Sequence, residues 1–421
     1  MMMSESMIRR PGARRRVRAA AVLTLSALAA LGASSASASA KVTITVTDYW
    51  AGGHGLAPLI AKFEKKYPNI VVQEQYVTPT AYSPGLRTAL LAGNAADVMA
   101  TNGGTGQGNS VMAIAPDLVN LASAPKAQAA VPDPAHDLYW RGNKLFGLPL
   151  GAGVDGLIYN AALFNQFHLK VPKTFGQLLG LCRAIKADGK VPMALAGNNA
   201  TFSFLEPAAN TVYGTQPTWN QLRRKNKVTF ASSKGWRQAM SEFQAMNSAG
   251  CFQPGATSAG IPQASSLIAT GQAVMWAAPP VAIGAITAVD PNFHAAIFPF
   301  PGPTAASTRA IIDYSASVSV NKHSPHVKQA TQFAEWLAQP AIDRQWAALN
   351  GTVAIADNEH AKLPPNLSAF LPYLKASKTV VLPYLTFTGT VFNDVLPTGL
   401  EGVLSGATSG TALLQQMDRG W

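Results

Sequence analysis

Over residues 42–100, hydrophobic residues recur in turn with the spacing of a strand and with the spacing of a helix. Residues 42–46 alternate between valine or isoleucine and threonine, as in a strand with one buried face. Hydrophobic residues of the segment 56–67 then recur at helical spacing as far as Pro68. A second strand at 70–75, a helix around 86–91 and a short strand at 97–100 follow. Strands that alternate with helices predict an α/β fold with a largely parallel sheet and crossover helices.

The segment 144–160 predicts where the chain changes lobe. It contains two short hydrophobic runs, 145–150 and 154–159, which are joined by Gly151-Ala152-Gly153. Such a strand suits a crossing from one lobe to another, with Gly151 and Gly153 as hinge residues where the backbone bends. The alternating pattern then restarts, and a second crossing is expected near residues 311–316. We therefore expect two α/β lobes.

The first 40 residues have the pattern of a signal peptide. Six arginines precede a hydrophobic run at 19–31, and Ala38-Ser39-Ala40 forms a cleavage signal. The hydrophobic run is too short for a membrane anchor. No cysteine lies near the cleavage point, so we do not expect a lipid anchor. We expect export to a periplasm or secretion, by the general or the twin-arginine route. Without these residues, 27 basic and 20 acidic residues leave a net charge of +7, down from +12.

The composition and the motifs favour a binding protein over an enzyme. The chain has 421 residues, 48% hydrophobic and 13% charged, which is enough for two lobes with full cores. No nucleophile elbow, phosphate-binding loop or zinc motif occurs, so no cofactor and no metal site are expected. The basic run 223–227 lacks interleaved aromatics, which favours a solvated loop over a nucleic-acid surface. A secreted glycosidase remains an alternative, because scattered carboxylates could flank a glycosidic bond.

Two cysteines, Cys182 and Cys251, occur in a chain that is expected to be exported. An even number of cysteines in an oxidising compartment permits one disulfide. Cys182 is predicted on a helix whose N-cap is Thr174, and Cys251 just follows another helix. A disulfide is slightly favoured over two buried thiols.

Aromatic and polar residues at the predicted strand ends favour a carbohydrate ligand. A sugar has an apolar ring face, which Trp and Tyr can cover, and hydroxyls that Asp, Asn and Gln can bind. Trp50 follows the first strand, and Tyr314 lies at the second crossing. Trp276 ends another strand, although packing in the core is an equal alternative. Ligands of α/β sheets meet loops at such strand ends.

From about residue 41 to the last residue, the chain resembles the extracellular solute-binding proteins of ABC importers, family 1, the type that binds maltose and oligosaccharides. The matching stretches occur in the family's order and spacing: LAPLIAKFEKKYPNIVV, LRTALLAGNAADVMATNGG, FGLPLGAGVDGLIYNAALF, PKTFGQLLGLCRAIKADGKVPMAL, GQAVMWAAPP, FAEWLAQPAIDRQWAALNGTVAIA and VLSGATSGTALLQQMDRGW. The resemblance implies the two-lobed periplasmic-binding-protein fold of type II, with two α/β lobes joined by crossing hinge segments.

The resemblance also implies the boundaries of the lobes. The N-terminal lobe would comprise residues 41–151 and 315–345, and the C-terminal lobe residues 152–314 and 346–421. Three crossings are expected near residues 151–154, 311–315 and 344–347. Strand ends and resemblance together predict these ligand-binding residues: Trp50, His54, Asn102, Gly103, Asp155, Phe202, Glu206, Trp276, Asp313, Tyr314, Asn393 and Asp394.

The expected function is delivery of a mono- or oligosaccharide to ABC transporter permease subunits, by a monomer that binds no nucleic acid and performs no chemistry. Asn393 lies about where the maltose type carries a stacking aromatic, which puts maltose itself in doubt. Alternatives of the same class are a polyol, a polyol phosphate or a polyamine. Few arginines lie at the predicted ligand loops, which disfavours a phosphate.

Overall fold

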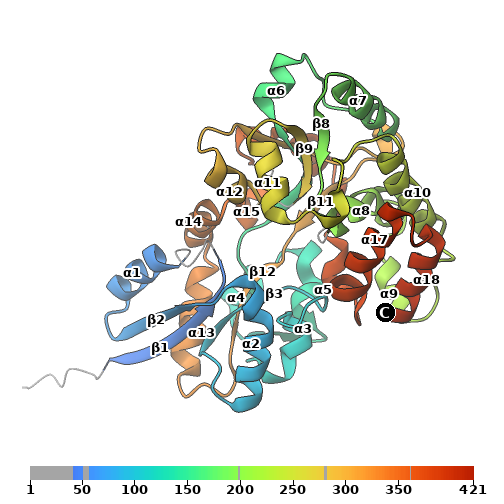
Figure 1. Cartoon of the computed structure of the whole chain (residues 1–421). Coiled ribbons are helices and arrows are strands. Elements are labelled where there is room, and N and C mark those ends of the chain that lie inside the picture. Colours follow the sequence, from blue (N-terminus) through green and yellow to red (C-terminus); the bar gives the residue numbers. More distant parts are fainter. Residues whose placement is uncertain (1–40, 51–55, 198–199, 279–281, 361) are drawn as a thin grey trace, which may run out of the picture. The chain divides into compact units, whose positions relative to one another are not determined.

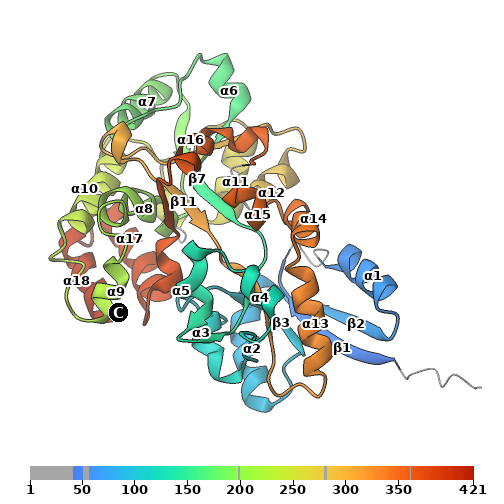
Figure 2. The ribbon, with the colours of Figure 1, turned by 180° about the vertical axis from the view of Figure 1, so that it is seen from behind.

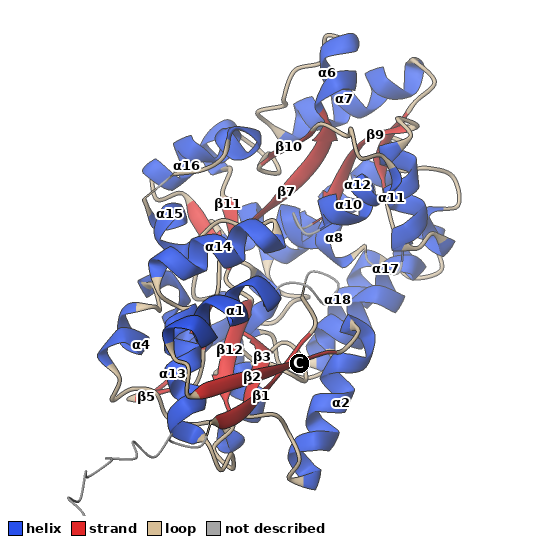
Figure 3. Cartoon of the chain, turned by 90° about the vertical axis from the view of Figure 1, so that its left-hand side faces the viewer, coloured by secondary structure: helices blue, strands red, loops and turns tan. Residues whose placement is uncertain are grey.

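A computed structural model describes residues 41–50, 56–197, 200–278, 282–360 and 362–421. Residues 41–421 form one compact unit. Its core is organised around two separate sheets, shown in red in Figure 3. The segment 1–40 and the predicted ligand residue His54 lie outside the described residues.

The first sheet has five strands in the order β2-β1-β3-β12-β6. β1 lies parallel to β2 and to β3, as the alternating pattern predicted, whereas β12 runs antiparallel to both β3 and β6. The buried hydroxyls of Thr101, Ser317 and Ser319 join β3 to β12, with Thr101 Oγ1 2.9 Å from each serine Oγ. The strands are β1 (Val42–Asp48), β2 (Ile70–Tyr76), β3 (Val98–Asn102), β6 (Leu148–Pro149) and β12 (Ala316–Val320).

Helices α1 (Ala57–Lys66), α2 (Pro79–Ala92) and α13 (Val327–Leu337) lie beside this sheet (Figure 1). α1 has its buried residues at helical spacing, and two lysines in its last turn complement the helix dipole. The Phe63 ring of α1 packs edge-on against Phe333 and Trp336 of α13, with ring centroids 4.8 and 5.3 Å apart. These aromatic contacts fix the two helices against each other on the sheet.

The second sheet has the order β13-β11-β7-β9-β8, and β10 also pairs with β7. Only the pairs β8/β9 and β11/β13 are parallel, because β7 runs antiparallel to each of its neighbours. The expectation of a largely parallel sheet therefore fails here: β7 enters the second sheet from the first, while β11 leaves it in the opposite direction. The strands are β7 (Gly153–Asn160), β8 (Val191–Ala194), β9 (Ala273–Ala278), β10 (Ala295–Phe298), β11 (Ala310–Asp313) and β13 (Thr379–Val381).

Helices α7 (Phe175–Ala187), α8 (Thr201–Ala208) and α11 (Ile261–Ala269) pack against the second sheet, and α10 (Lys234–Ser248) packs against α7 and α8. Thr174 caps α7, since its side chain accepts a hydrogen bond from the Gln177 backbone N–H. A disulfide joins Cys182 of α7 to Cys251, which follows α10, the pairing that the sequence left open.

Two chain segments pass side by side between the sheets, as the view from behind shows for β7 and β11 (Figure 2). Residues 150–152 connect β6 to β7, and Tyr314-Ser315 connects β11 to β12. Gly151 has φ +64°, and its backbone N–H donates to Asp343 Oδ1 at 2.7 Å. A side chain at Gly151 would be strained by this φ and would meet Thr352 Oγ1 at 2.5 Å. The third predicted crossing, 344–347, lies inside α14 (Pro340–Asn350).

The structure corrects one expectation about a charged segment. The basic run 223–227 is not a solvated loop throughout, because Arg223 is buried in α9 (Trp219–Arg224). Its guanidinium donates to the Asp418 carbonyl at 3.0 Å and lies 3.6 Å from that residue's carboxylate. The spacing of charges could not reveal this, since Asp418 is far away in the sequence.

The other described helices and short strands complete the chain. They are α3 (Val111–Ile114), α4 (Pro125–Ala129), α5 (His136–Tyr139), β4 (Trp140–Arg141), β5 (Lys144–Leu145), α6 (Ala161–Gln166), α12 (Ala282–Val289), α15 (Ile355–Glu359), α16 (Leu371–Lys375), α17 (Leu396–Ser405) and α18 (Gly410–Gly420).

Candidate functional site

Two of the predicted ligand residues lie on adjacent strands of the second sheet. Asp155 of β7 is opposite Ile311 of β11, and Asp313 is opposite Gly153. Side chains of paired residues share a face, and residues two apart on one strand share it as well. Asp155, Asp313 and the position of Gly153 are therefore on one face. Because Gly153 has no side chain, nothing at that position separates the two carboxyl groups.

A third predicted residue, Glu206, reaches the same acidic group from α8. α8 packs against β9, which is the neighbour of β7 in the sheet. The charges of Asp313 and Glu206 both act on Asp155. We call Asp155, Glu206 and Asp313 the acidic cluster. The sequence predicted each of these residues separately, and the fold brings them together.

The acidic cluster is buried and disfavours negative charge. Asp155 is 2% exposed and Glu206 4% exposed, while Asp313 is half-buried. Burial, followed by the charges of Asp313 and Glu206, raises the pKa of Asp155 well above its usual value. Burial also raises the pKa of Glu206 to about 8. The pKa of Asp313 is raised by burial too, although Asp313 Oδ1 accepts a hydrogen bond from the Ser315 N–H at 2.7 Å.

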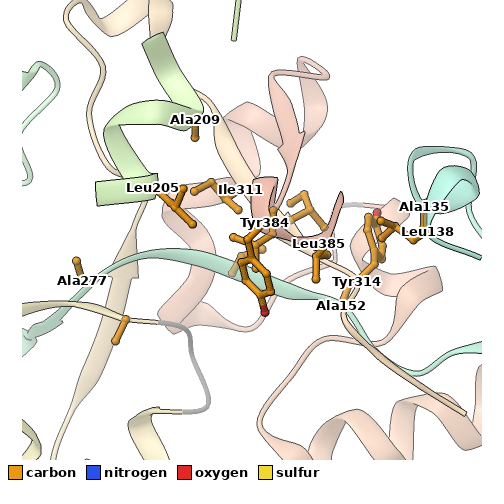
Figure 4. Packing of buried hydrophobic residues seen from close by; sticks show 14 of the residues in the cluster. Ala135, Leu138, Ala152, Leu205, Ala209, Ala277, Ile311, Tyr314, Tyr384 and Leu385 are labelled. Carbon is orange, nitrogen blue, oxygen red and sulfur yellow. The ribbon is translucent and has the colours of Figure 1, made fainter. Parts of the chain in front are cut away.

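An aromatic group lies beside the acidic cluster. The Tyr384 ring stacks on Phe392 with ring centroids 3.8 Å apart, and Phe202 packs edge-on to both rings. Burial, then the charges of Asp313 and Asp155, raise the pKa of Tyr384, which places its hydroxyl within electrostatic reach of the acids. Figure 4 shows the Tyr384 ring with its hydroxyl directed away from Leu205 and Ile311.

Sequence reasoning predicted Phe202 and placed ligand contacts near Phe392, but it missed Tyr384. Tyr384 lies in a 3-10 turn, Pro383–Thr386, and not at the end of a strand with a recognisable period. Its position beside β11 is set by β13, which precedes the turn and pairs with β11. The available signal was local: an aromatic follows a Leu-Pro step after a short hydrophobic run.

Tyr49, also missed, connects Asn102 to the same region. Its hydroxyl donates to Asn102 Oδ1 at 2.6 Å, and Asn102 Nδ2 donates to the side chain of Gln107. Burial chiefly raises the pKa of Tyr49, and the charge of Asp313 contributes. Asn102 is therefore held by side chains of its own loop and of the residue after β1.

Gly103 allows a close approach of three chain segments. Its N–H donates to the Ser315 carbonyl at 2.8 Å, and a Cβ would lie 2.9 Å from both the Tyr139 hydroxyl and the Tyr314 carbonyl. The Tyr139 hydroxyl donates to that same carbonyl at 2.6 Å. A side chain at position 103 would therefore clash with its neighbours at the second crossing.

The other predicted residues make contacts of their own within the fold or lie at the surface. Trp50 packs edge-on against Trp346 of α14, with ring centroids 5.2 Å apart. Trp276 is 2% exposed within β9, and the Tyr314 hydroxyl donates to Glu359 Oε1 at 2.5 Å. Asn393 is exposed, and its Nδ2 donates to the Gly106 carbonyl at 3.3 Å. Asp394 lines a surface pocket with Thr398, Thr408, Gln416 and Arg419.

The described residues contain no group of three or more His, Cys, Asp or Glu side chains with the geometry of a metal site. Likewise, none of the helices in the described part of the chain is long and apolar enough to cross a membrane.

Residues 48–344 match the family model of the bacterial extracellular solute-binding proteins. The match covers well over half of the chain, and the chain belongs to this family. The two-sheet fold agrees with this family's two-lobed architecture.

Comparisons with individual proteins give more distant similarities. The chain is 25% identical to the multiple sugar-binding protein of Streptococcus mutans over 213 residues, which are 50% of this chain and 51% of that protein. It is 23% identical to the melibiose/raffinose/stachyose-binding protein MelE of Bacillus subtilis, over 49% of this chain and 50% of that protein. The chain thus spans about half the length of these curated relatives.

Solved structures match over most of the chain and show the fold. RafE in complex with raffinose has a TM-score of 0.73 at 20% identity, covering 90% of this chain and 98% of that one. The GacH receptor of Streptomyces glaucescens has a TM-score of 0.71 at 19% identity, covering 90% and 97%. Both similarities confirm the periplasmic-binding-protein fold of type II.

Proposed function

We propose that the protein binds a mono- or oligosaccharide among residues of both lobes and delivers it to the permease subunits of an ABC importer. The observation that carries this proposal is the acidic cluster beside the Tyr384, Phe392 and Phe202 rings. Aromatic rings suit the apolar face of a sugar, and carboxylates accept hydrogen bonds from its hydroxyls. Family membership and the sugars named for the relatives support the same ligand class.

The proposed lobes are those that the sequence suggested: residues 41–151 and 315–345, and residues 152–314 and 346–421. In support, β1, β3 and β12 share one sheet, while β7, β9 and β11 share the other. Gly151 and Gly153 are the proposed hinge residues, at the point where the chain passes from β6 to β7. A ligand favours closure only if it binds both lobes better when they are closed.

The proposed ligand contacts beyond the acidic cluster remain those of the sequence prediction. The loop containing Gly104–Gly106 supports a contribution from the first lobe. The Thr105 N–H donates to the Leu385 carbonyl at 2.7 Å, next to Tyr384. This contact brings the loop after β3 to the aromatic group of the second lobe.

Export and a monomeric state complete the proposal. The family is extracellular, and the segment 1–40 supports cleavage and release without a lipid anchor. In this proposal the protein has no enzymatic activity and uses no cofactor. A secreted glycosidase stays the alternative of a different class, because Asp155, Glu206 and Asp313 are carboxylic acids grouped together.

A thermal-shift screen against mono- and oligosaccharides, polyols and polyamines tests the proposal. A ligand at 100 times its dissociation constant stabilises the folded state by about 2.7 kcal/mol. We expect a selective shift with a sugar that is recovered unchanged. Hydrolysis of that sugar would instead favour the glycosidase, and a shift with a polyol or polyamine alone would move the ligand to another class of polar solute.

A further inference from the structure

The acidic cluster has no basic partner. Within the described part of the chain, no Lys, Arg or His forms an ion pair with Asp155, Glu206 or Asp313. The contacts between acidic and basic side chains that do form lie elsewhere: His136–Asp137, Arg223–Asp418, His323–Asp117 and Arg344–Asp357. Three carboxyl groups are thus gathered in a buried place without a positive charge from the protein. Burying an unpaired carboxylate strongly destabilises the folded state.

At Asp155, hydrogen bonds from the described residues do not take the place of a basic partner. At 2% exposure, neither of its carboxylate oxygens accepts a hydrogen bond from any described residue. Other buried aspartates behave differently: Asp343 accepts from the Gly151 and Ile355 backbone N–H groups at 2.7 and 2.8 Å. The acceptor capacity of Asp155 is therefore free for a ligand.

The surroundings of Asp155 also suit a cation. Gly153 leaves the face between Asp155 and Asp313 without a side chain, and a Cβ there would lie 3.1 Å from Asp313 Cβ. The Tyr384 ring is close enough for its pKa to respond to both aspartates. Carboxylates next to an aromatic ring are the groups that proteins use to bind ammonium ions.

We infer that the ligand carries a positively charged nitrogen, as an amino sugar or an amine-substituted oligosaccharide does, and that its ammonium group lies among Asp155, Glu206 and Asp313. This inference rests on the proposed carbohydrate function and deepens it. An ammonium group has three N–H donors, so it can donate to more than one carboxylate at once. A neutral sugar brings no positive charge and leaves these acids protonated, whereas an ammonium group favours their charged forms.

Matched sugars that differ only at carbon 2 test the inference. We would measure dissociation constants by isothermal titration calorimetry at pH 7 for glucosamine, N-acetylglucosamine and glucose, and for the corresponding galactose series. The β-1,4-linked trisaccharides of the first three sugars and spermidine complete the set. We expect an amino member of one series to bind at least tenfold more tightly than its acetamido and hydroxyl counterparts.

Two variants connect this preference to the acidic cluster. Asp155→Asn should reduce the preference for the amino sugar at least tenfold, because the ammonium loses a charged acceptor. Glu242→Gln is the matched control: Glu242 is another buried carboxyl, on α10, whose pKa burial raises to about 7. It is not part of the acidic cluster, and its replacement should leave the preference unchanged.

The outcomes separate this inference from the function on which it rests. If neutral sugars bind as tightly as their amino counterparts, or more tightly, the carbohydrate function stands and the inference is overturned. Binding of spermidine without any sugar would support recognition of a cation and contradict the carbohydrate function. If neither an amino sugar nor spermidine binds, the inference fails. An equal loss of preference in Glu242→Gln would also overturn the role given to the acidic cluster.

Discussion

The two sheets differ in how a buried aspartate is hydrogen-bonded. Asp97, just before β3 in the first sheet, accepts hydrogen bonds from the Thr45 N–H at 2.7 Å, the Thr45 hydroxyl at 2.9 Å and the Ser324 hydroxyl. Asp155, in β7 of the second sheet, is buried to a similar extent and accepts none from the described residues. The first carboxylate stabilises the fold. The second is held without partners in a way that stabilises the fold poorly and suits a ligand.

The two regions also differ in covalent cross-linking, since the disulfide belongs to the second sheet. We predict that replacing Cys182 and Cys251 together by alanine lowers the free energy of unfolding by about 4 kcal/mol, because the unfolded chain regains the freedom of a long loop. The sequence separation of the two cysteines is 69 residues. Urea titration measures the loss. Hydrogen exchange should show that amides of α7 and β8 lose protection while those of β1 and β3 keep it; uniform loss would contradict the separation of the two regions.

Removing the partnered carboxylate should cost nearly as much. Asp97→Ala leaves three donors without their acceptor, and we predict a loss of about 3 kcal/mol in the free energy of unfolding. Asp133, an exposed aspartate, provides the control, and Asp133→Ala should change stability by less than about 0.5 kcal/mol. If Asp97→Ala were as harmless as its control, the hydrogen bonds of Asp97 would not be structural.

The acidic cluster should make the ligand-free protein less stable as the pH rises. Glu206 has a pKa of about 8 in the folded protein, above its value of 4.5 in the unfolded chain. The stability linked to its bound proton is complete below about pH 4.5 and is lost as the pH rises through about 8. Burial raises the pKa of Asp155 and of Asp313 as well, so these two groups act in the same direction.

Glu206→Gln should therefore flatten this pH dependence. Between pH 6 and 8 the variant should lose about 2 kcal/mol less than the parent protein, as read from denaturant titrations at each pH. Asp48 and Glu242 have pKa values of about 7, and their contributions are common to both proteins. Superimposable curves for parent and variant would mean that Glu206 does not retain its proton in the folded state.

The smallest effect on stability is expected for Asp155, whose hydrogen bonding differs most from that of Asp97. Asp155→Asn should raise the free energy of unfolding at pH 8 by about 1 kcal/mol, because the cost of holding this carboxyl away from water is removed while the buried amide still lacks partners. Thermal or urea unfolding without ligand measures this gain. A loss of stability comparable to that of Asp97→Ala would show that Asp155 has structural partners after all.

Prediction from sequence succeeded where a local pattern carried the information. The strand at β1, the helix at α1 and the glycine step before β7 were all visible as periods or breaks in the hydrophobic pattern. The acids of the cluster were predicted one by one, from strand ends and crossings together with the family resemblance. The sequence could not show that these acids meet, because register, which pairs Asp313 with Gly153, depends on how β7 and β11 align.

Ser324 illustrates the other limit. A serine before a proline predicts a helix N-cap. In the structure α13 begins only at Val327, and the Ser324 hydroxyl both accepts from the His326 N–H at 2.8 Å and donates to Asp97. The local hydrogen bond follows from the spacing along the chain, whereas the one to Asp97 is decided by the tertiary structure.

The sequence by itself determined the α/β elements and the glycine step before β7, because periodicity and punctuation are local properties of the chain. Only the tertiary structure decided which of those residues form a cluster and which are occupied by packing. It placed Tyr384 beside Asp155 and Asp313, and it left Asp155 without a partner. The physical reason is that hydrogen-bond satisfaction and desolvation depend on neighbours contributed by distant parts of the chain, and no spacing within one segment records them.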